Sequence, residues 1–193
     1  MARLTGSKKI KTAVFISGTG SNLQSLIKFS KLKKSPISIE MIVSDNSESK
    51  GLAFGKIYKI NTNIFNFKKQ VIAERELLFK LKKNQINLIC LAGFMKILSK
   101  NFIIKFKGKI LNIHPSLLPK YKGLKTHEKA IKNRDRYSGC TVHYVNSKLD
   151  SGKTVIQKKV KIKKNDTAKS LAKKILTQEH KLYPKAILKI FNL

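Results

Sequence analysis

Short runs of apolar, largely β-branched residues alternate along most of the chain with stretches of helical periodicity. This alternation is typical of a parallel sheet with helices on both faces. The runs expected to form buried strands are residues 12–17, 37–44, 86–92 and 109–113. The expected helices are residues 21–34 and 68–83, the second with Val71, Ile72, Leu77, Leu78 and Leu81 on its buried side. We therefore predict an α/β fold whose twisted sheet is mostly parallel.

The pattern changes in the C-terminal third of the chain. Residues 114–123 (HPSLLPKYKG) contain two prolines and cannot form a regular strand or helix. Residues 140–145 and 155–162 then alternate apolar with polar positions, as half-exposed antiparallel strands do. The sequence thus predicts that antiparallel strands complete the parallel sheet.

A final helix is expected to run to about Phe191, with Asn165 or Asp166 as its N-cap. Its expected buried positions include Leu171, Ile175 and Leu182. The sequence shows no internal repeat, low-complexity linker or charged tail. Residues 1–193 are therefore expected to form a single domain, with residues 1–11 as a flexible N-terminal extension.

The chain carries 42 lysines and arginines against 10 acidic residues, which gives a formal net charge of +32. Such a balance suits a nucleic-acid partner. Only four of the cations are arginines, however. Arginine is the residue that best forms paired hydrogen bonds to phosphate and guanine. Aromatic residues make up only 8% and tryptophan is absent, so platforms for stacking bases are scarce. We expect no specific nucleic-acid partner and keep a non-enzymatic nucleic-acid-binding module as an alternative.

The two cysteines, Cys90 and Cys140, stand far apart and outside any CxxC or Cys/His spacing. We expect neither a disulfide framework nor a metal site. We do expect a reducing, cytoplasmic location. The longest apolar run, residues 86–94, is well below the roughly 20 residues that span a bilayer. Residues 13–16, the apolar stretch behind the N-terminal lysines, are too short for the core of a signal peptide. We expect no membrane partner and either a monomer or a homodimer.

The first candidate for chemistry is SGTGSNLQ, residues 17–24, between an expected strand and an expected helix. Gly18 and Gly20 allow tight turns. The Ser21 hydroxyl, the Asn22 amide and the first N–H groups of the helix form a cradle for an anion. The segment matches neither the GxGxxG nor the Walker pattern. An ordinary glycine-rich turn with Ser21 as the helix N-cap explains it equally well.

A second candidate is the end of the strand expected at residues 109–113. Asn112 and His114 are two residues apart, so an extended strand turns both side chains to the same side. Open α/β sheets bind ligands at the edge where their strands end. An asparagine amide can donate to a developing oxyanion, and a histidine can move protons near neutral pH. The alternative is that both side chains satisfy backbone groups of the following loop.

Two acidic residues of this basic chain are further candidates. Asp150, in KLDSG, is either an ordinary turn aspartate or a group that orients a histidine and raises its pKa. Glu179 lies in the basic last helix, where it either binds a ligand amine or pairs with Lys181 or another lysine. No spacing among the four histidines suggests a metal site, and three of them are interpreted as structural: His127, His143 and His180.

Six short segments together carry a resemblance to a known family. In chain order they are SGTGSNLQ, LAGFMKILS, LNIHPSLLPKYKGL, TVHYV, LDSG and TQEH. Over residues 12–184 the chain resembles the phosphoribosylglycinamide formyltransferases, folate-dependent enzymes of purine biosynthesis. The resemblance implies a Rossmann-like formyltransferase fold. It also implies transfer of the formyl group of 10-formyltetrahydrofolate to the amine of 5′-phosphoribosylglycinamide (GAR), with no metal.

Carried over position by position, the resemblance implies roles for three groups of residues. In the catalytic group, Asn112 donates to the oxyanion, His114 is the acid and base, and Asp150 orients and tunes His114. The GAR-binding residues, of which the first three hold the phosphate, are Gly20, Ser21, Asn22 and Glu179. The folate-binding residues are Gln70, Met95, Lys96, Ile97, Leu98 and Asn112.

Two positions depart from the pattern of the family. Arginine often stands in the family where this chain has Lys96. A basic residue also assists the folate in the family near the position that aligns with Gln70. Lys68 and Lys69 are the nearest cations that could take over that contact, so the contacts to the folate tail are the least defined part of the predicted site.

Two other members of the wider formyltransferase group share an Asn/His/Asp site. A 10-formyltetrahydrofolate hydrolase passes the formyl group to water and is expected to carry an N-terminal regulatory domain, whereas about eleven residues precede the first expected strand here. An initiator methionyl-tRNA formyltransferase is expected to carry a C-terminal RNA-binding domain, which would lie beyond Leu193. We therefore expect the GAR enzyme and keep the hydrolase as the alternative.

Overall fold

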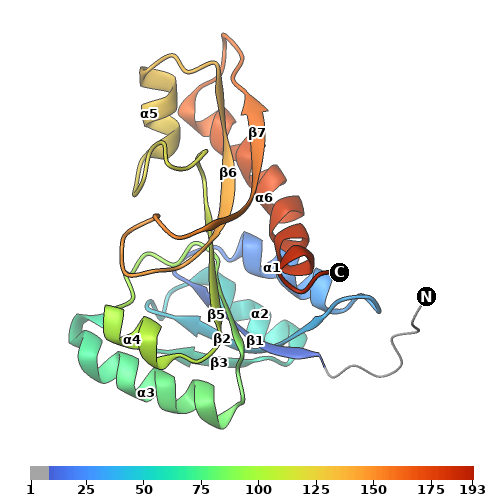
Figure 1. Ribbon diagram of the computed structural model, residues 1–193, viewed down its shortest axis with the longest axis vertical. Coiled ribbons are helices and arrows are strands. Elements are labelled where there is room, and N and C mark those ends of the chain that lie inside the picture. Colours follow the sequence, from blue (N-terminus) through green and yellow to red (C-terminus); the bar gives the residue numbers. More distant parts are fainter. Residues whose placement is uncertain (1–8) are drawn as a thin grey trace.

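A computed structural model describes residues 9–193 as one seven-stranded sheet with helices packed on it (Figure 1). In order across the sheet, the strands are β3 (Asn61–Ile64), β2 (Ile37–Ser44), β1 (Ile10–Ile16), β4 (Leu88–Leu91), β5 (Lys109–His114), β6 (Tyr137–Tyr144) and β7 (Thr154–Lys161). The pairs from β3 to β5 are parallel, and the β5–β6 and β6–β7 pairs are antiparallel. The predicted α/β fold, mostly parallel with antiparallel strands in the C-terminal third, is confirmed.

Residues 9–193 also form five α-helices and two short 3-10 turns between the strands, and a sixth α-helix after the last strand. The helices are α1 (Ser21–Ser30), α2 (Ala53–Tyr58), α3 (Gln70–Lys83), α4 (Lys100–Lys105), α5 (Thr126–Lys132) and α6 (Ala168–Ile190). The 3-10 turns, η1 (Lys50–Leu52) and η2 (Phe67–Lys69), lead into α2 and α3. Helices thus follow most of the parallel strands, as right-handed crossovers between parallel neighbours require.

Strand β1 is buried on both faces and contributes to two hydrophobic clusters. Val14 and Ile16 belong to the cluster that includes residues of α1 and α6. Ala13 and Phe15 belong to the cluster that includes residues of α3 and α4. Because side chains alternate across a strand, a strand covered on both faces must be apolar at every position. This explains the uninterrupted apolar run at residues 13–16.

Strands β6 and β7 extend beyond the parallel part of the sheet, with α5 beside them (Figure 1). Strand β6 pairs with β5 from Leu111↔Tyr144 to His114↔Thr141 and with β7 along its length. The long helix α6 packs against α1 and against both β6 and β7. One helix therefore fastens the antiparallel part of the molecule to the parallel part.

The first strand and first helix have other boundaries than predicted. Strand β1 begins at Ile10, which pairs with Ile37, so Ile10 and Lys11 belong to the sheet and not to an N-terminal extension. Residues 1–8 of that predicted extension lie outside the described residues. Helix α1 ends at Ser30 and not at residue 34, because the chain must turn back to enter β2.

The buried face of α3 differs from the predicted one. Leu77 and Leu81 are buried as expected, but Val71 and Ile72 are 82% and 45% exposed. The helix turns Ala73, Leu77 and Leu81 toward the sheet, spaced four residues apart on one face. Val71 and Ile72 lie outside that face. The prediction that they belong to the side of the helix that packs on the sheet is therefore wrong.

Helix α6 is capped by Thr167 and not by Asn165 or Asp166. The Thr167 hydroxyl accepts from the Ser170 N–H at 3.1 Å, and the Ser170 hydroxyl accepts from the Thr167 N–H at 3.0 Å. This reciprocal capping box satisfies two helix-end donors at once. Asp166 instead accepts from the Ser170 hydroxyl and pairs with Lys174 at 2.6 Å. The predicted core of the helix, Leu171, Ile175 and Leu182, is confirmed as buried.

Four elements have no counterpart in the sequence prediction: α2, β3, α4 and α5. All are short, and β3 is an edge strand with exposed residues such as Asn61 and Thr62. Elements of four to seven residues contain too few turns or alternations to define a period. Their positions are set by the sheet that they cover or extend.

Candidate functional site

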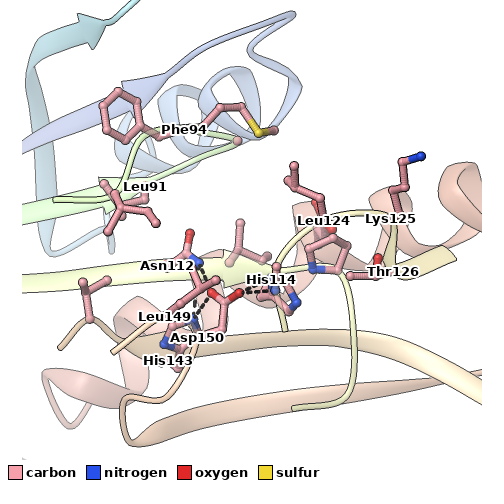
Figure 2. A pocket seen from close by; sticks show the side chains of 18 of the residues that line it. Leu91, Phe94, Asn112, His114, Leu124, Lys125, Thr126, His143, Leu149 and Asp150 are labelled. Carbon is pink, nitrogen blue, oxygen red and sulfur yellow. Dashed lines mark hydrogen bonds and ion pairs between the residues drawn. The ribbon is translucent and has the colours of Figure 1, made fainter. Parts of the chain in front are cut away.

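A cavity of about 940 Å³ lies where β4 and β5 end, between the parallel and antiparallel parts of the molecule. Its wall is formed by the end of β5, the loop after β4, the segment between β5 and α5, the β6–β7 connection and α6. Figure 2 shows Asn112, His114, His143 and Asp150 converging on one side of it, with Phe94 across the opening. Open α/β sheets commonly bind ligands at this edge.

The three residues predicted to be catalytic lie together. Asn112 and His114 project from β5 into the cavity, and Asp150 enters it from the β6–β7 connection. His114 Nδ1 is 3.3 Å from Asp150 Oδ2, and Asn112 Nδ2 is 3.4 Å from Asp150 Oδ1. The two β5 residues therefore share a side as their spacing predicts, and the aspartate bridges them.

Two backbone features place Asp150. The residue has a φ of 43°, a left-handed conformation that aspartate tolerates better than most residues. Its Oδ2 accepts from the Gly123 N–H at 2.8 Å. Two residues on, Gly152 lies against the Tyr144 carbonyl, where a Cβ would clash with the backbone. The close approach of this connection to β6 therefore requires a glycine at position 152.

The protonation geometry of His114 follows from its two partners. Its Nε2 is 2.8 Å from the Tyr121 carbonyl, which can only accept, so Nε2 carries a proton. Nδ1, which faces Asp150, is then the nitrogen that gains and loses a proton. Burial lowers the pKa of His114, and the Tyr121 carbonyl and the Asp150 charge partly offset that effect.

The carboxylate of Asp150 remains ionised despite its burial. Burial alone would raise its pKa, but the adjacent His143 ring, the hydrogen bond from the Gly123 N–H and the charge of His114 outweigh it. The pKa of Asp150 therefore lies below its ordinary value. An ionised carboxylate beside Nδ1 stabilises the charged form of His114.

His143, predicted to be a structural sheet residue, is also part of this cluster. It lies in β6 directly opposite Asn112 and is 2% exposed. Its Nδ1 is 2.8 Å from the Tyr144 carbonyl, so Nε2 is free to accept from Asn112 Nδ2 at 3.3 Å. The TVHYV segment carries this residue, but only the antiparallel register with β5 brings it to Asn112.

The residues predicted to bind GAR divide into two groups. Asn22 and Glu179 line the cavity, and Asn22 Nδ2 donates to Glu179 Oε2 at 2.7 Å. Glu179 therefore pairs with neither Lys181 nor another lysine, and burial raises its pKa. Gly20 and Ser21 do not line this cavity. Gly20, with a φ of 74°, is the N-cap of α1, so the alternative that made Ser21 the cap is wrong.

The loop after β4 brings four of the predicted folate-binding residues to the cavity: Met95, Lys96, Ile97 and Leu98. Asp45, directly after β2, contacts both the glycine-rich loop and the loop after β4. It accepts from the Ser17 hydroxyl and lies 3.7 Å from Lys96 Nζ. The Met95 N–H in turn donates to the Ser17 hydroxyl at 2.8 Å. The glycine-rich loop and the loop after β4 thus share one set of hydrogen bonds.

Gln70 does not line the cavity. Its amide donates to the Ile97 carbonyl and to Glu74 Oε1, each at 2.9 Å. Glu74, 5% exposed, also accepts from both the N–H and the hydroxyl of Ser99. Sequence reasoning missed Glu74, because an acid on a helix surface gives no sign that it will fasten a loop. Gln70 supports the shape of the predicted folate loop from outside.

Three further findings concern residues 9–193. No helix there is long and apolar enough to cross a membrane. No group of three or more His, Cys, Asp or Glu side chains in that range is arranged to hold a metal ion. Both cysteines, Cys90 and Cys140, are free thiols in the core, where burial raises the pKa of each to about 12.

Sequence comparison finds close relatives of the chain. Residues 10–187 match the formyl transferase family. Phosphoribosylglycinamide formyltransferase of Haemophilus influenzae is 40% identical over 180 residues, which cover 92% of this chain and 85% of that protein. The human trifunctional purine biosynthetic protein adenosine-3 is 40% identical over 183 residues, 93% of this chain but 18% of that protein. The chain spans 14–18% of the length of the first four trifunctional relatives that it matches.

Solved structures agree with the sequence relatives. The crystal structure of phosphoribosylglycinamide formyltransferase from Brucella melitensis has a TM-score of 0.89 and 40% identity, and the match covers 95% of this chain and 96% of that one. The corresponding structure from Anaplasma phagocytophilum has a TM-score of 0.88 and 40% identity, covering 93% and 85%. The chain therefore belongs to the formyl transferase family and groups with the members named phosphoribosylglycinamide formyltransferase.

Proposed function

We propose that the chain transfers the formyl group of 10-formyltetrahydrofolate to the amine of GAR, giving formyl-GAR and tetrahydrofolate in de novo purine biosynthesis. One observation carries the proposal: Asn112, His114 and Asp150 meet at the wall of a large cavity in a chain of this family. The names of the relatives support the choice of substrates. The cytoplasmic location and the monomeric or dimeric state stay predictions.

The cavity has features that suit both substrates. On the GAR side, Asn22 Oδ1 is buried and has no hydrogen-bond partner among residues 9–193, and the Glu179 carboxylate lies beside it. Two acceptors at one wall suit an amine or amide donor. Next to them, the first N–H groups of α1 suit a phosphate.

The folate side of the cavity suits a partly apolar ligand. Exposed apolar side chains surround its opening: Met95, Ile97, Leu124 and Leu149. Apolar walls with a few polar groups are usual in sites for small organic ligands. A volume of about 940 Å³ is at the upper end of the range usual for such sites, which suits two substrates together.

The chemistry needs an oxyanion donor and a proton carrier. When bound, the folate supplies a formyl carbon to which the GAR nitrogen bonds while the bond to the folate nitrogen breaks. Asn112 Nδ2 donates to the formyl oxygen as it gains charge, and its present contacts of 3.3 and 3.4 Å are long enough to exchange for that bond. His114 Nδ1 carries the proton that the amine loses to the leaving folate nitrogen, so the protons balance. Asp150 orients His114 and stabilises its charged form.

A transfer assay with the purified chain tests this proposal. The chain is mixed with 10-formyltetrahydrofolate and either GAR or no acceptor, and the folate product is followed by absorbance. We expect product only when GAR is present, with formyl-GAR formed in equal amount. Equal rates with and without GAR would instead support the hydrolase, and no product in either mixture would overturn both.

A further inference from the structure

One short segment, residues 120–123, contacts both His114 and Asp150 through its backbone. The Tyr121 carbonyl accepts from His114 Nε2 at 2.8 Å. The Gly123 N–H donates to Asp150 Oδ2 at 2.8 Å. Both bonds are shorter than the 3.3 Å between His114 Nδ1 and Asp150 Oδ2. The position of this segment therefore governs how the two side chains face each other.

The segment belongs to no helix or strand and is held by side chains. Tyr121 has a φ of 55°, which a tyrosine keeps only where its surroundings impose it. Lys120 Nζ donates to Asp135 Oδ1 at 2.6 Å, and Asn133 Nδ2 donates to the Tyr121 hydroxyl at 2.7 Å. Within the loop, the Ser116 hydroxyl donates to the Lys120 carbonyl at 2.6 Å. Lys122 Nζ also donates to the Ser151 hydroxyl of the β6–β7 connection at 2.6 Å. The other two residues that contact this segment from outside the loop, Asn133 and Asp135, both follow α5.

The turn after α5 is itself well defined. Arg134 has a φ of 51°, its N–H donates to the Ile131 carbonyl, and the Asp135 N–H donates to the Ala130 carbonyl, both at 3.0 Å. This is the Schellman arrangement that ends many helices. It turns Asn133 and Asp135 toward the segment, and neither residue lines the cavity.

We propose that Asn133 and Asp135 are positioning residues for the reaction: they hold residues 120–123 so that the Tyr121 carbonyl and the Gly123 N–H align His114 with Asp150. The proposal rests on the proposed function of the His114 and Asp150 pair. A helix end outside the cavity thereby determines the geometry of the acid and base. Small displacements of reacting groups are enough to slow an enzyme severely.

The contacts to this turn fit a positioning role better than a stabilising one. The Lys120 side chain is 55% exposed and that of Asp135 is 11% exposed, so solvent reaches and screens the ion pair from the lysine side. The Asn133–Tyr121 bond also lies at an exposed part of the surface. Loss of these bonds is therefore expected to affect turnover more than folding.

The test uses three single variants of the full chain: Asn133→Ala, Asp135→Ala and Tyr121→Phe, the last of which keeps the ring and removes only the hydroxyl. We expect kcat to fall about tenfold or more in each alanine variant, and in Tyr121→Phe by about as much as in Asn133→Ala, because both remove the same bond. KM for both substrates should change less than about twofold. Lys120→Met combined with Asp135→Ala should be no slower than Asp135→Ala alone, because both remove one contact.

A second readout does not depend on the reaction. In nitrogen-15 NMR of the unliganded chain, the His114 Nε2–H is expected to be protected from exchange by the Tyr121 carbonyl, and to lose that protection in Asn133→Ala and Asp135→Ala. If the parent chain transferred no formyl group, the proposed function would fail. This measurement would still test whether Asn133 and Asp135 hold residues 120–123 against His114. Unchanged protection in both variants would overturn the positioning role.

Asp166→Asn is the matched control. Asp166 pairs with Lys174 at 2.6 Å, the same length as the Lys120–Asp135 pair, but contacts neither residues 120–123 nor the catalytic side chains. We expect the control to keep both its kcat and its protected His114 proton. The proposal is overturned if all three test variants keep kcat within about twofold of the parent, or if their loss of kcat is matched in Asp166→Asn.

Discussion

The carboxylate of Asp150 joins the two halves of the candidate site. Its Oδ2 faces His114 Nδ1 and the Gly123 N–H, and its Oδ1 faces Asn112 Nδ2 and His143 Nε2. Each oxygen thus has two partners from different parts of the chain. A change at this one residue is expected to disturb the oxyanion donor and the proton carrier together.

Asp150→Asn and His114→Ala are each expected to lower kcat by about 100-fold or more, the usual contribution of a positioned acid or base. The asparagine keeps the shape of Asp150 but removes the charge that stabilises protonated His114. Steady-state kinetics of the purified variants measure the effect, with thermal melting to verify folding. Glu48→Gln, at an exposed acid that does not line the cavity, is the control. Turnover near that of the parent in either variant would remove the residue from the mechanism.

Stability is expected to fall when the pH is lowered through about 6.5, the ordinary value for histidine. Burial lowers the pKa of His114, His127 and His180 in the folded chain. Below the ordinary value the unfolded chain therefore binds more protons than the folded one, and stability present above pH 6.5 is lost. Melting temperatures across this range measure the slope, and His180→Gln should reduce it. A flat or opposite slope would contradict the lowered pKa values.

Glu179→Gln is expected to stabilise the folded chain while weakening the reaction. Burial raises the pKa of Glu179, so its ionised form costs free energy in the fold at neutral pH and above. The glutamine removes that charge and can still accept from Asn22. We expect a gain of about 0.5–2 kcal/mol in unfolding free energy at pH 8, with a higher KM for GAR. Denaturant melts measure the unfolding free energy, and steady-state kinetics measure the KM. A loss of stability would show that the ionised Glu179 carboxylate does not destabilise the fold.

At the scale of elements, the long helix α6 depends on its capping box. Thr167→Ala removes the acceptor for the Ser170 N–H, and we expect a loss of about 1 kcal/mol in stability with little change in kcat. The matched control is Thr177→Ala, because the Thr177 hydroxyl donates to the Lys173 carbonyl one turn back in the same helix. Urea denaturation of the two variants measures the difference. Equal stability would mean that the helix end is held by other contacts.

The long elements were predictable because their apolar positions repeat. The run at residues 13–16 indicates correctly that both faces of β1 are covered. The alternation at residues 140–145 predicts a half-exposed strand and is wrong, because Cys140, Thr141, Val142 and His143 are all buried. Exposure of Val71 was not predictable, since a helix with apolar residues around its first turn does not reveal which side meets the sheet. The same limit explains the Thr167 cap, because Asn165, Asp166 and Thr167 could each serve and the backbone at the first turn of the helix decides among them.

The residues of the candidate site also divide into those that a local pattern predicts and those that it does not. Asn112 and His114 share a strand, so their spacing alone predicts a common side. His143, Glu74 and Asp135 act through contacts with residues far away in the sequence, and no local pattern marks them. Residue types alone make Asp150 and Glu179 candidates but leave each with an ordinary explanation beside the functional one, and the family resemblance then favours the functional one.

At the scale of the whole molecule, the charge of +32 is expected to assist substrate encounter. Both proposed substrates are anions, and a positive field raises the rate at which anions arrive. We expect kcat/KM to fall several-fold when salt rises from about 20 to about 200 mM, with kcat nearly constant. Stopped-flow or steady-state measurements over that range test it. Insensitivity to salt would mark the lysines as background composition.

The hydrogen bond between Asn22 and Glu179 joins residues 157 positions apart. One comes from the first helix and the other from the last, so this wall of the cavity exists only after α6 has docked on α1. Contacts so distant in sequence close late, because the intervening loop must first be ordered. A nascent chain can therefore assemble its parallel strands during synthesis, yet it gains a complete substrate wall only once its C-terminal helix has left the ribosome.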